Sequence, residues 1–347
     1  MKQQINAVVL GSALLRLFAC SSGSTTSGAS TDGGTSLVTD AAMDSGASVW
    51  DGDVSPQAAE TKKDLVFRTV GDKSLAGDLW LPDRTTPVPA VIQIHGGGFS
   101  AGTKDDPAEV LWSEHLISQG FAAFSVNYRL YSDFSDGEIP FPSAPMDIKC
   151  SIMWLRKNAL NFRVDPNHIF VLGGSAGGYM TNFLGTTGDL PEFTPTDCAD
   201  GAKESNRLQG VVTYFGPSDF NQLFNDPARV GLSNLANGEK KFIGLTGQTP
   251  CAPGSAEASG ICKTASATTY IDASDPPFYV THSDDDPVVP VTQGRYMSEQ
   301  LKAGKVDVTY HEVTGMKHGW HANWKDVHGV GMAIRDEVVA WLKARSK

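Results

Sequence analysis

The chain has 347 residues, of which 40% are hydrophobic and 19% are charged. This length can bury a substantial core, which excludes wholesale disorder, and the mean hydropathy of -0.19 excludes a polytopic membrane protein. The formal net charge is -11, from 28 Lys and Arg against 39 Asp and Glu. A nucleic acid partner is not expected, because so acidic a surface repels phosphates.

The first sixty residues differ in composition from the rest of the chain. Ile5–Leu15 is apolar or small throughout and is too short to cross a bilayer as a helix, which is typical of a signal peptide. It leads to Ala19-Cys20 and a Ser/Gly/Thr tract, an arrangement that resembles a bacterial lipoprotein signal with Cys20 as the lipidated residue. The alternative is an ordinary secretory signal in which Cys20 is incidental. In either case we expect an exported protein, as a bacterial cell-envelope lipoprotein or in a periplasmic or secreted form.

These observations predict three segments. Residues 1–20 are expected to be the signal peptide, residues 21–60 a flexible linker, and residues 61–347 the folded domain. The linker is composed largely of Ser, Thr, Gly, Ala and Asp, so it cannot bury enough apolar surface to offset the entropy of ordering. A lipid on Cys20 would anchor the folded domain at a membrane surface without spanning it.

The folded domain alternates predicted strands with predicted helices. A hairpin is expected from Leu65–Val70 and Gly77–Leu81, and the next strands are near-continuous apolar runs, as in strands covered on both faces. The further strands are predicted over 90–94, 121–126, 168–172, 211–215, 278–282 and 306–312, and the helices over 107–119, 144–160, 175–184 and 327–342. The alternation predicts an α/β fold, a mostly parallel sheet with helices on both faces. Residues 220–268, rich in Gly, Asn, Pro and Thr, interrupt it and are expected to form a lid-like insertion.

Four cysteines follow Cys20, and an even number favours disulfides in an exported chain. Cys251 and Cys262 flank a Pro/Gly/Ser loop, so we pair them, which leaves Cys150 with Cys198. For Cys150, which lies on a helical pattern, a buried free thiol is the alternative. The chain has no C-x-x-C pair, which argues against a zinc site or a thioredoxin-type motif.

The segment Gly173-Gly174-Ser175-Ala176-Gly177 is a G-x-S-x-G motif between a predicted strand and a predicted helix. That context favours a nucleophile over a structural turn, because a tight strand-to-helix turn lifts the hydroxyl of Ser175 clear of the backbone. A second Gly-rich segment, His95–Phe99, directly follows the strand over 90–94. The N–H groups of Gly97 and Gly98, with that of Ala176, are expected to bind an oxyanion. The alternatives are a flexible loop or a phosphate cradle, but no phosphate-binding spacing is present.

Three motifs occur in the order in which α/β-hydrolase esterases carry them: His95-Gly96-Gly97-Gly98-Phe99, Val126-Asn127-Tyr128-Arg129-Leu130, and Asp165–Ile169 leading into Gly174–Gly178. From about Leu65 onward the chain resembles the hormone-sensitive-lipase-like carboxylesterases and their carbohydrate-esterase relatives, including feruloyl and acetyl-xylan esterases. Many hormone-sensitive-lipase-like members carry Asp where this chain has Gly174, which favours the carbohydrate-esterase branch. The resemblance implies the α/β-hydrolase fold, serine esterase activity, and no metal or organic cofactor.

In this fold an acid and then a histidine follow the nucleophile. The family carries an Asp four residues after a His that ends a strand, and this spacing from His282 selects Asp286 as the acid. Asp284 and Asp285 are the alternative acids. A cation site made from all three aspartates is a further alternative. His318 lies on a Gly-flanked loop after the last strand and is the expected base. Its competitors are His311, His321 and His328.

Other residues matching the family carry expectations of their own. His95 is expected to orient the oxyanion loop, and Asp147 and Arg129 are expected to be structural. The aromatic residues that either line the substrate pocket or pack in the core are Phe99, Tyr179, Phe215 and Trp320.

The sequence therefore predicts an exported serine carboxylesterase that forms an acyl-enzyme on small or carbohydrate-linked esters. An amidase or peptidase with the same triad is one alternative. A catalytically silent binding protein of the same fold, tethered as a surface lipoprotein, is the other. The acyl and alcohol groups and the oligomeric state are not predicted.

Overall fold

The structure is a computed structural model that describes residues 60–135, 138, 140–229, 236–245, 250–322 and 330–347. The predicted signal peptide, Cys20 and His328 lie outside the described residues, as does the linker apart from its last residue. All described residues belong to the compact unit Trp50–Lys347. Within them, no helix is both long and apolar enough to span a membrane.

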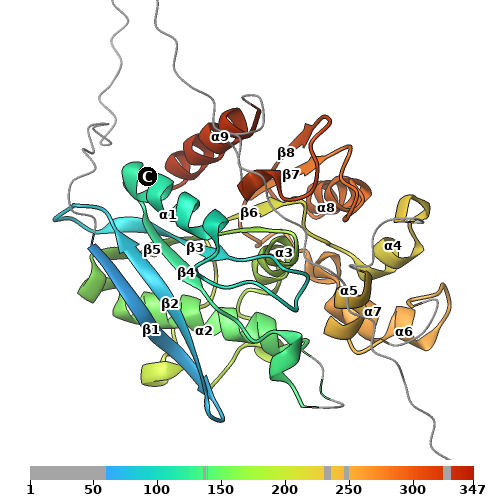
Figure 1. Ribbon diagram of the computed structural model, residues 1–347, viewed down its shortest axis with the longest axis horizontal. Helices are drawn as coiled ribbons and strands as arrows, with labels where there is room; N and C mark the ends of the chain where they lie inside the picture. The colour runs from blue at the N-terminus through green and yellow to red at the C-terminus, as the bar shows by residue number, and fades with distance from the viewer. Residues whose placement is uncertain (1–59, 136–137, 139, 230–235, 246–249, 323–329) are drawn as a thin grey trace, which may run out of the picture. The chain divides into compact units, whose positions relative to one another are not determined.

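The described part of the chain forms one eight-stranded sheet with the order β1-β2-β4-β3-β5-β6-β7-β8 (Figure 1). The strands are β1 (Glu60–Val70), β2 (Lys73–Leu81), β3 (Val88–Ile94), β4 (Ala122–Val126), β5 (Val164–Gly174), β6 (Gly210–Tyr214), β7 (Phe278–Ser283) and β8 (Val308–Val313). β1 pairs antiparallel with β2, and β2 with β4, whereas all pairs from β4 to β8 are parallel. This is the α/β-hydrolase arrangement expected from the sequence.

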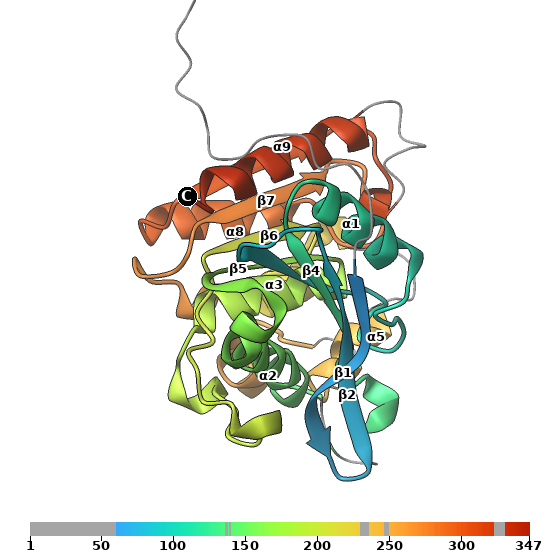
Figure 2. The ribbon, with the colours of Figure 1, turned by 90° about the vertical axis from the view of Figure 1, so that its left-hand side faces the viewer.

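Two layers of buried hydrophobic residues cover the two faces of the sheet. Figure 2 shows the helices that flank it, with α1 and α9 on one side and α2 and α3 on the other. The layers draw on alternate residues of the same strand, as the two-residue period of a strand requires: Ile92 lies in one layer and Val91 in the other. One layer holds residues of α2 (Ser143–Asn158), α3 (Ala176–Thr187) and α8 (Thr292–Ala303). The other holds residues of α1 (Pro107–Ser118) and α9 (Val330–Ala344).

The described part of the expected insertion contains four short α-helices, which lie on the side of the molecule where the parallel strands end (Figure 1). They are α4 (Phe220–Asn225), α5 (Ala236–Phe242), α6 (Ala256–Ser259) and α7 (Ile261–Ala265). Helix α8 was not predicted, because it begins directly after the Pro-rich segment that follows Asp286 and its mean hydropathy is low. Strands β1, β2 and β5 begin earlier than predicted, at Glu60, Lys73 and Val164, and the other element boundaries differ by a few residues.

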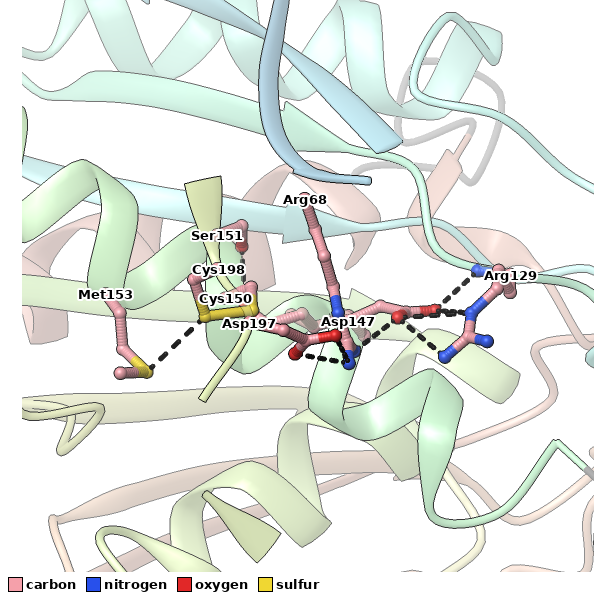
Figure 3. Close-up of polar contacts among 9 residues, drawn as sticks. Arg68, Arg129, Asp147, Cys150, Ser151, Met153, Asp197 and Cys198 are labelled. Carbon is pink, nitrogen blue, oxygen red and sulfur yellow. Dashed lines mark hydrogen bonds and ion pairs between the residues drawn. A yellow bond between two sulfur atoms is a disulfide. The ribbon is translucent and has the colours of Figure 1, made fainter. Parts of the chain in front are cut away.

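Both expected disulfides, Cys150–Cys198 and Cys251–Cys262, are present. The first lies beside a buried cluster of charges (Figure 3). Asp147 accepts hydrogen bonds from Arg68 (2.7 Å) and from Arg129 (2.9 Å), and its side chain has no solvent exposure. Arg68 also pairs with Asp197, next to Cys198. The disulfide and the cluster tie α2 and the Cys198 loop to β1, so Arg129 and Asp147 have the structural role expected of them.

Candidate active site

Ser175 lies between the end of β5 and the start of α3, with φ 59° and ψ -121°. A positive φ is uncommon for a residue with a side chain, and it is held here by two backbone hydrogen bonds: Ser175 N donates to Tyr214 O (3.0 Å), and Tyr179 N donates to Ser175 O (2.9 Å). The neighbouring glycines are required by close packing, since a Cβ on Gly177 would lie 2.0 Å from Ile94 O. This is the strained strand-to-helix turn expected of the nucleophile.

His318 connects Ser175 to Asp286. Its Nε2 lies 2.8 Å from Ser175 Oγ, and its Nδ1 lies 2.7 Å from Asp286 Oδ2. The other oxygen of Asp286 accepts hydrogen bonds from the N–H groups of Val288 (2.8 Å) and Val289 (3.0 Å). Burial by itself would raise the pKa of Asp286, but the hydrogen bonds from His318 and the backbone outweigh it and hold that pKa below its ordinary value. The carboxylate therefore stays ionised beside the imidazole.

The loop after β7 is joined to the loop after β8 by a series of side chains. The last residue of β7 and the three residues that follow it each contact the second loop: Ser283 with Met316 N, Asp284 with Gly315 N, Asp285 with Lys317 Nζ, and Asp286 with His318. Asp284 and Asp285, the two alternatives for the acid, thus hold the loop that carries the base. No group of three or more His, Cys, Asp or Glu side chains is placed to hold a metal ion in the described ranges.

The Gly-rich loop after β3 lies against the nucleophile. Because β3 and β5 are parallel neighbours, both end at the same edge of the sheet, and a Cβ on Gly96 would lie 3.4 Å from Ser175 Cβ. Gly97 and Gly98 have φ values of 101° and 58°, which glycine adopts without strain. The N–H groups of Gly97 and Gly98 have no acceptor among the described residues, and that of Ala176, the first residue of α3, has none within its helix. These are the three donors expected for an oxyanion hole.

His95 supports this loop from within. Its side chain is buried, its Nδ1 lies 2.9 Å from Gly96 O, and its ring stacks on Tyr128 at 4.4 Å between centroids. The hydroxyl of Tyr128 donates to His95 O (3.2 Å). Burial lowers the pKa of His95, so its imidazole is neutral. This geometry suits the orienting role expected for His95 rather than proton transfer.

The described competitors of His318 are engaged elsewhere. His311 lies in β8 and its Nδ1 is 3.0 Å from Glu337. His321 packs against the turn before the nucleophile, where a Cβ on Gly174 would lie 2.5 Å from its Nε2. Burial lowers the pKa of His321 to about 3, so this ring is neutral. Position 174, where many similar enzymes carry Asp, is therefore a glycine in this chain because an imidazole occupies the space of a side chain.

His282 was used in the sequence analysis only to set the register of the acid. In the structure it is fully buried, its Nε2 donates to Val289 O (2.9 Å), and the same nitrogen lies 3.7 Å from Asp286 Oδ2. Since Val289 N donates to Asp286, His282 fixes the turn that holds the acid. The strand-ending position of His282 was the available signal for this supporting role.

The insertion contacts the oxyanion loop directly. It leaves the sheet after β6, between the strand that precedes Ser175 and the strand that precedes Asp286. A Cβ on Gly238 of α5 would lie 2.4 Å from Gly98 O, and the ring of Phe242 stacks on Phe99 at 4.2 Å between centroids. No sequence pattern indicated these contacts. The aromatic residues whose position was open are all buried in the core, at 4% exposure or less: Phe99, Tyr179, Phe215 and Trp320.

Comparisons with known proteins identify the family of this chain. The BD-FAE family model matches residues 78–301, which include Ser175 and Asp286. "Probable carboxylic ester hydrolase LipM" of Mycobacterium tuberculosis is 30% identical over 70% of this chain and 52% of its own length. "Esterase LipQ" of the same organism is 28% identical over 76% of this chain and 58% of its own length. The chain thus spans about half the length of these curated relatives.

Solved structures share the fold. "Truncated form of carbohydrate esterase from gut microbiota" superposes with a TM-score of 0.65 at 22% identity, covering 83% of this chain and 96% of its own. The native Est2 esterase of Thermogutta terrifontis superposes with a TM-score of 0.62 at 21% identity, covering 83% of this chain and 93% of its own. The family model covers more than half of the chain, and the chain belongs to the BD-FAE family.

Proposed function

We propose that this protein is a serine carboxylic ester hydrolase whose catalytic residues are Ser175, His318 and Asp286. The observation that carries the proposal is the continuous hydrogen-bond chain from Ser175 through His318 to Asp286, beside the N–H groups of Gly97 and Gly98, which have no acceptor in the part of the chain that the structure describes. The esterase names of the curated relatives support the same activity. A nucleophile, a base, an orienting acid and an oxyanion site are the complete set that acyl transfer needs.

In the proposed reaction, Ser175 Oγ attacks the ester carbonyl carbon while its proton passes to His318 Nε2. Asp286 keeps the other proton of the imidazole on Nδ1 and stabilises the imidazolium. The carbonyl oxygen becomes an oxyanion that accepts hydrogen bonds from the N–H groups of Gly97, Gly98 and Ala176. The intermediate then expels the alcohol, which takes the proton from His318 and leaves the acyl group on Ser175. Water, deprotonated by His318, releases the acid by the same steps.

The substrate class we favour is an ester on a carbohydrate. Two solved structures that share the fold are described as a carbohydrate esterase and as a bifunctional GH43-CE protein. We further propose that the chain is exported through residues 1–20, with Cys20 as a lipid attachment residue and residues 21–60 as the tether. Replacing Cys20 with Ser should abolish incorporation of labelled palmitate in a bacterial host, and a labelled Cys20→Ser variant would contradict the anchor.

The decisive experiment compares the wild type with Ser175→Ala on p-nitrophenyl acetate. We expect kcat to fall by about 10⁶-fold, and a quenched wild-type reaction should carry one acyl group on the peptide containing Ser175. Ser74→Ala, on the β1–β2 hairpin, is the matched control and should keep full activity. Undiminished hydrolysis by Ser175→Ala would refute the mechanism.

A substrate panel then separates the alternatives. p-Nitrophenyl acetate, methyl ferulate and acetylated xylan test the ester classes, and p-nitroacetanilide tests the amidase. Higher kcat/KM on the anilide would favour the amidase, and binding of acetylated xylan without turnover would favour the silent binding protein.

A further inference from the structure

Phe215 occupies a backbone conformation that disfavours it. It follows the last residue of β6 with φ 40°, yet its N–H still donates to Thr281 O of β7 (2.8 Å). Glycine adopts this conformation easily, whereas a bulky residue is a genuine outlier there. Such strain persists only where the surroundings fix it, and it concentrates at functional sites. The presence of an aromatic side chain at position 215, where the backbone favours glycine, therefore indicates a role for the ring.

The ring of Phe215 packs against the base of the triad. Its side chain is 1% exposed, and its centroid lies 4.6 Å from that of His318, with the two planes 56° apart. On another side His321 lies 4.9 Å away with its plane at 76°. His282, behind Asp286, is farther, at 6.4 Å. Phe215 thus contacts two imidazoles, and of these two only that of His318 is hydrogen-bonded to Ser175.

The two other histidines near Phe215 are neutral. Burial lowers the pKa of His321 to about 3 and that of His282 to about 4, so both stay uncharged near neutral pH. His318 becomes an imidazolium when it accepts the proton of Ser175. A cation within about 6 Å of an aromatic centroid is attracted by the negative potential of the ring face. The Phe215 ring lies within this distance of a charge that exists only during the reaction.

We propose that Phe215 is a positioning residue that holds the His318 imidazole against Asp286 and stabilises its imidazolium form. This inference rests on the proposed function. The step it assists is balanced within the enzyme–ester pair: the Ser175 Oγ–H bond breaks, the Oγ–carbonyl carbon bond forms, and the proton moves to His318 Nε2. Phe215 exchanges no atom and acts only through His318.

The test replaces Phe215 in the full chain with 4-fluoro-, 3,5-difluoro- and 3,4,5-trifluorophenylalanine. Fluorine withdraws the negative charge of the ring face while nearly preserving its shape, so folding is kept. We expect kcat on p-nitrophenyl acetate to fall stepwise, by about two- to fivefold for the trifluoro ring, with KM unchanged. The same series at Phe67 is the matched control, because Phe67 is equally buried but lies in β1, and it should show no trend.

Phe215→Leu and Phe215→Gly separate the ring from the backbone. Both remove the ring and should lower kcat more than the trifluoro variant does, while the glycine also relieves the positive φ and should not restore activity. A constant kcat across the fluorinated series, or an equal slope at Phe67, overturns the role of Phe215 while the proposed function stands. If the wild type and Ser175→Ala hydrolyse the ester equally, the proposed function fails and this inference fails with it.

Discussion

Among the residues that the structure describes, two aspartates have side chains without solvent exposure, and they differ in their partners. Asp147 is held by the guanidinium groups of Arg68 and Arg129, which keep their charge permanently (Figure 3). Asp286 is held by two backbone N–H groups and by His318, whose charge can change. In the first arrangement, the charge of the carboxylate is balanced permanently by the arginines, which suits a structural role. In the second arrangement, the carboxylate of Asp286 can still stabilise a positive charge that forms on His318, which suits a catalytic role.

Replacing Asp286 with Asn gives the largest expected effect. The amide keeps the shape but cannot hold the imidazole in the tautomer that leaves Nε2 free to accept a proton, so kcat should fall by about 10⁴-fold. Steady-state kinetics with p-nitrophenyl acetate measure this, and circular dichroism checks that the fold is intact. Asp307→Asn is the control, since Asp307 is exposed and pairs with Arg345, a residue outside the site. A kcat for Asp286→Asn within tenfold of the wild type would contradict the assignment of the acid.

Replacing Asp147 with Asn should instead affect stability. The change leaves two buried guanidinium groups facing a neutral amide, and breaking a buried pair in this way costs about 3 to 5 kcal/mol of unfolding free energy. Urea unfolding measures the loss, and the kcat of the folded fraction should stay close to the wild-type value. Asp197→Asn, which touches Arg68 from an exposed position, should cost less than about 1 kcal/mol. Equal losses for the two variants would refute the distinction.

Another buried carboxyl extends the comparison, because Glu109 of α1 has no cationic partner among the described residues. Burial, with a smaller contribution from Asp106, raises the pKa of Glu109 to about 7 from its ordinary value of 4.5. Between these values the folded protein keeps a proton that the unfolded chain releases, so Glu109 lowers stability as pH rises through this window. Below it, both states are protonated and the contribution vanishes.

Glu109→Gln should therefore gain stability relative to the wild type as pH rises. We expect a difference of about 2 kcal/mol between the urea unfolding free energies compared at pH 5 and at pH 8. Glu114→Gln on the same helix is the control, because Glu114 is exposed, and its difference from the wild type should not vary with pH. A pH-independent difference for Glu109→Gln would show that this carboxyl is ionised in the folded protein.

Local sequence patterns were sufficient to predict most of the fold and the central residues of the site. Ser175 and His318 were predictable because each lies in a Gly-flanked turn after a strand, and strand-forming runs buried on both faces are distinctive in composition. Asp286 needed the family register, because three consecutive aspartates look alike until the loop after β8 assigns each a different partner. Those partners are about thirty positions away, beyond the reach of any local pattern.

Contacts between distant segments were not predictable. The sequence predicts Phe215 as the last residue of a strand, and neither its positive φ nor its contact with His318 has a signature in the neighbouring residues. Gly174 was noticed as a departure, but its cause is a side chain that comes 147 positions later, that of His321. The sequence also gives no sign that position 238 requires glycine, because the requirement comes from close packing against the carbonyl oxygen of Gly98.

The proposed catalytic groups lie far apart along the chain, and this separation determines when activity can appear during folding. Ser175 and His318 are 143 positions apart, and the Gly-rich loop comes from a strand that precedes both. No contiguous fragment shorter than this span contains both the attacking oxygen and the nitrogen that activates it. Enzymatic activity would therefore indicate that the whole sheet has formed. During refolding, activity should appear only after the last strand, β8, has joined the sheet, even if the central strands assemble early.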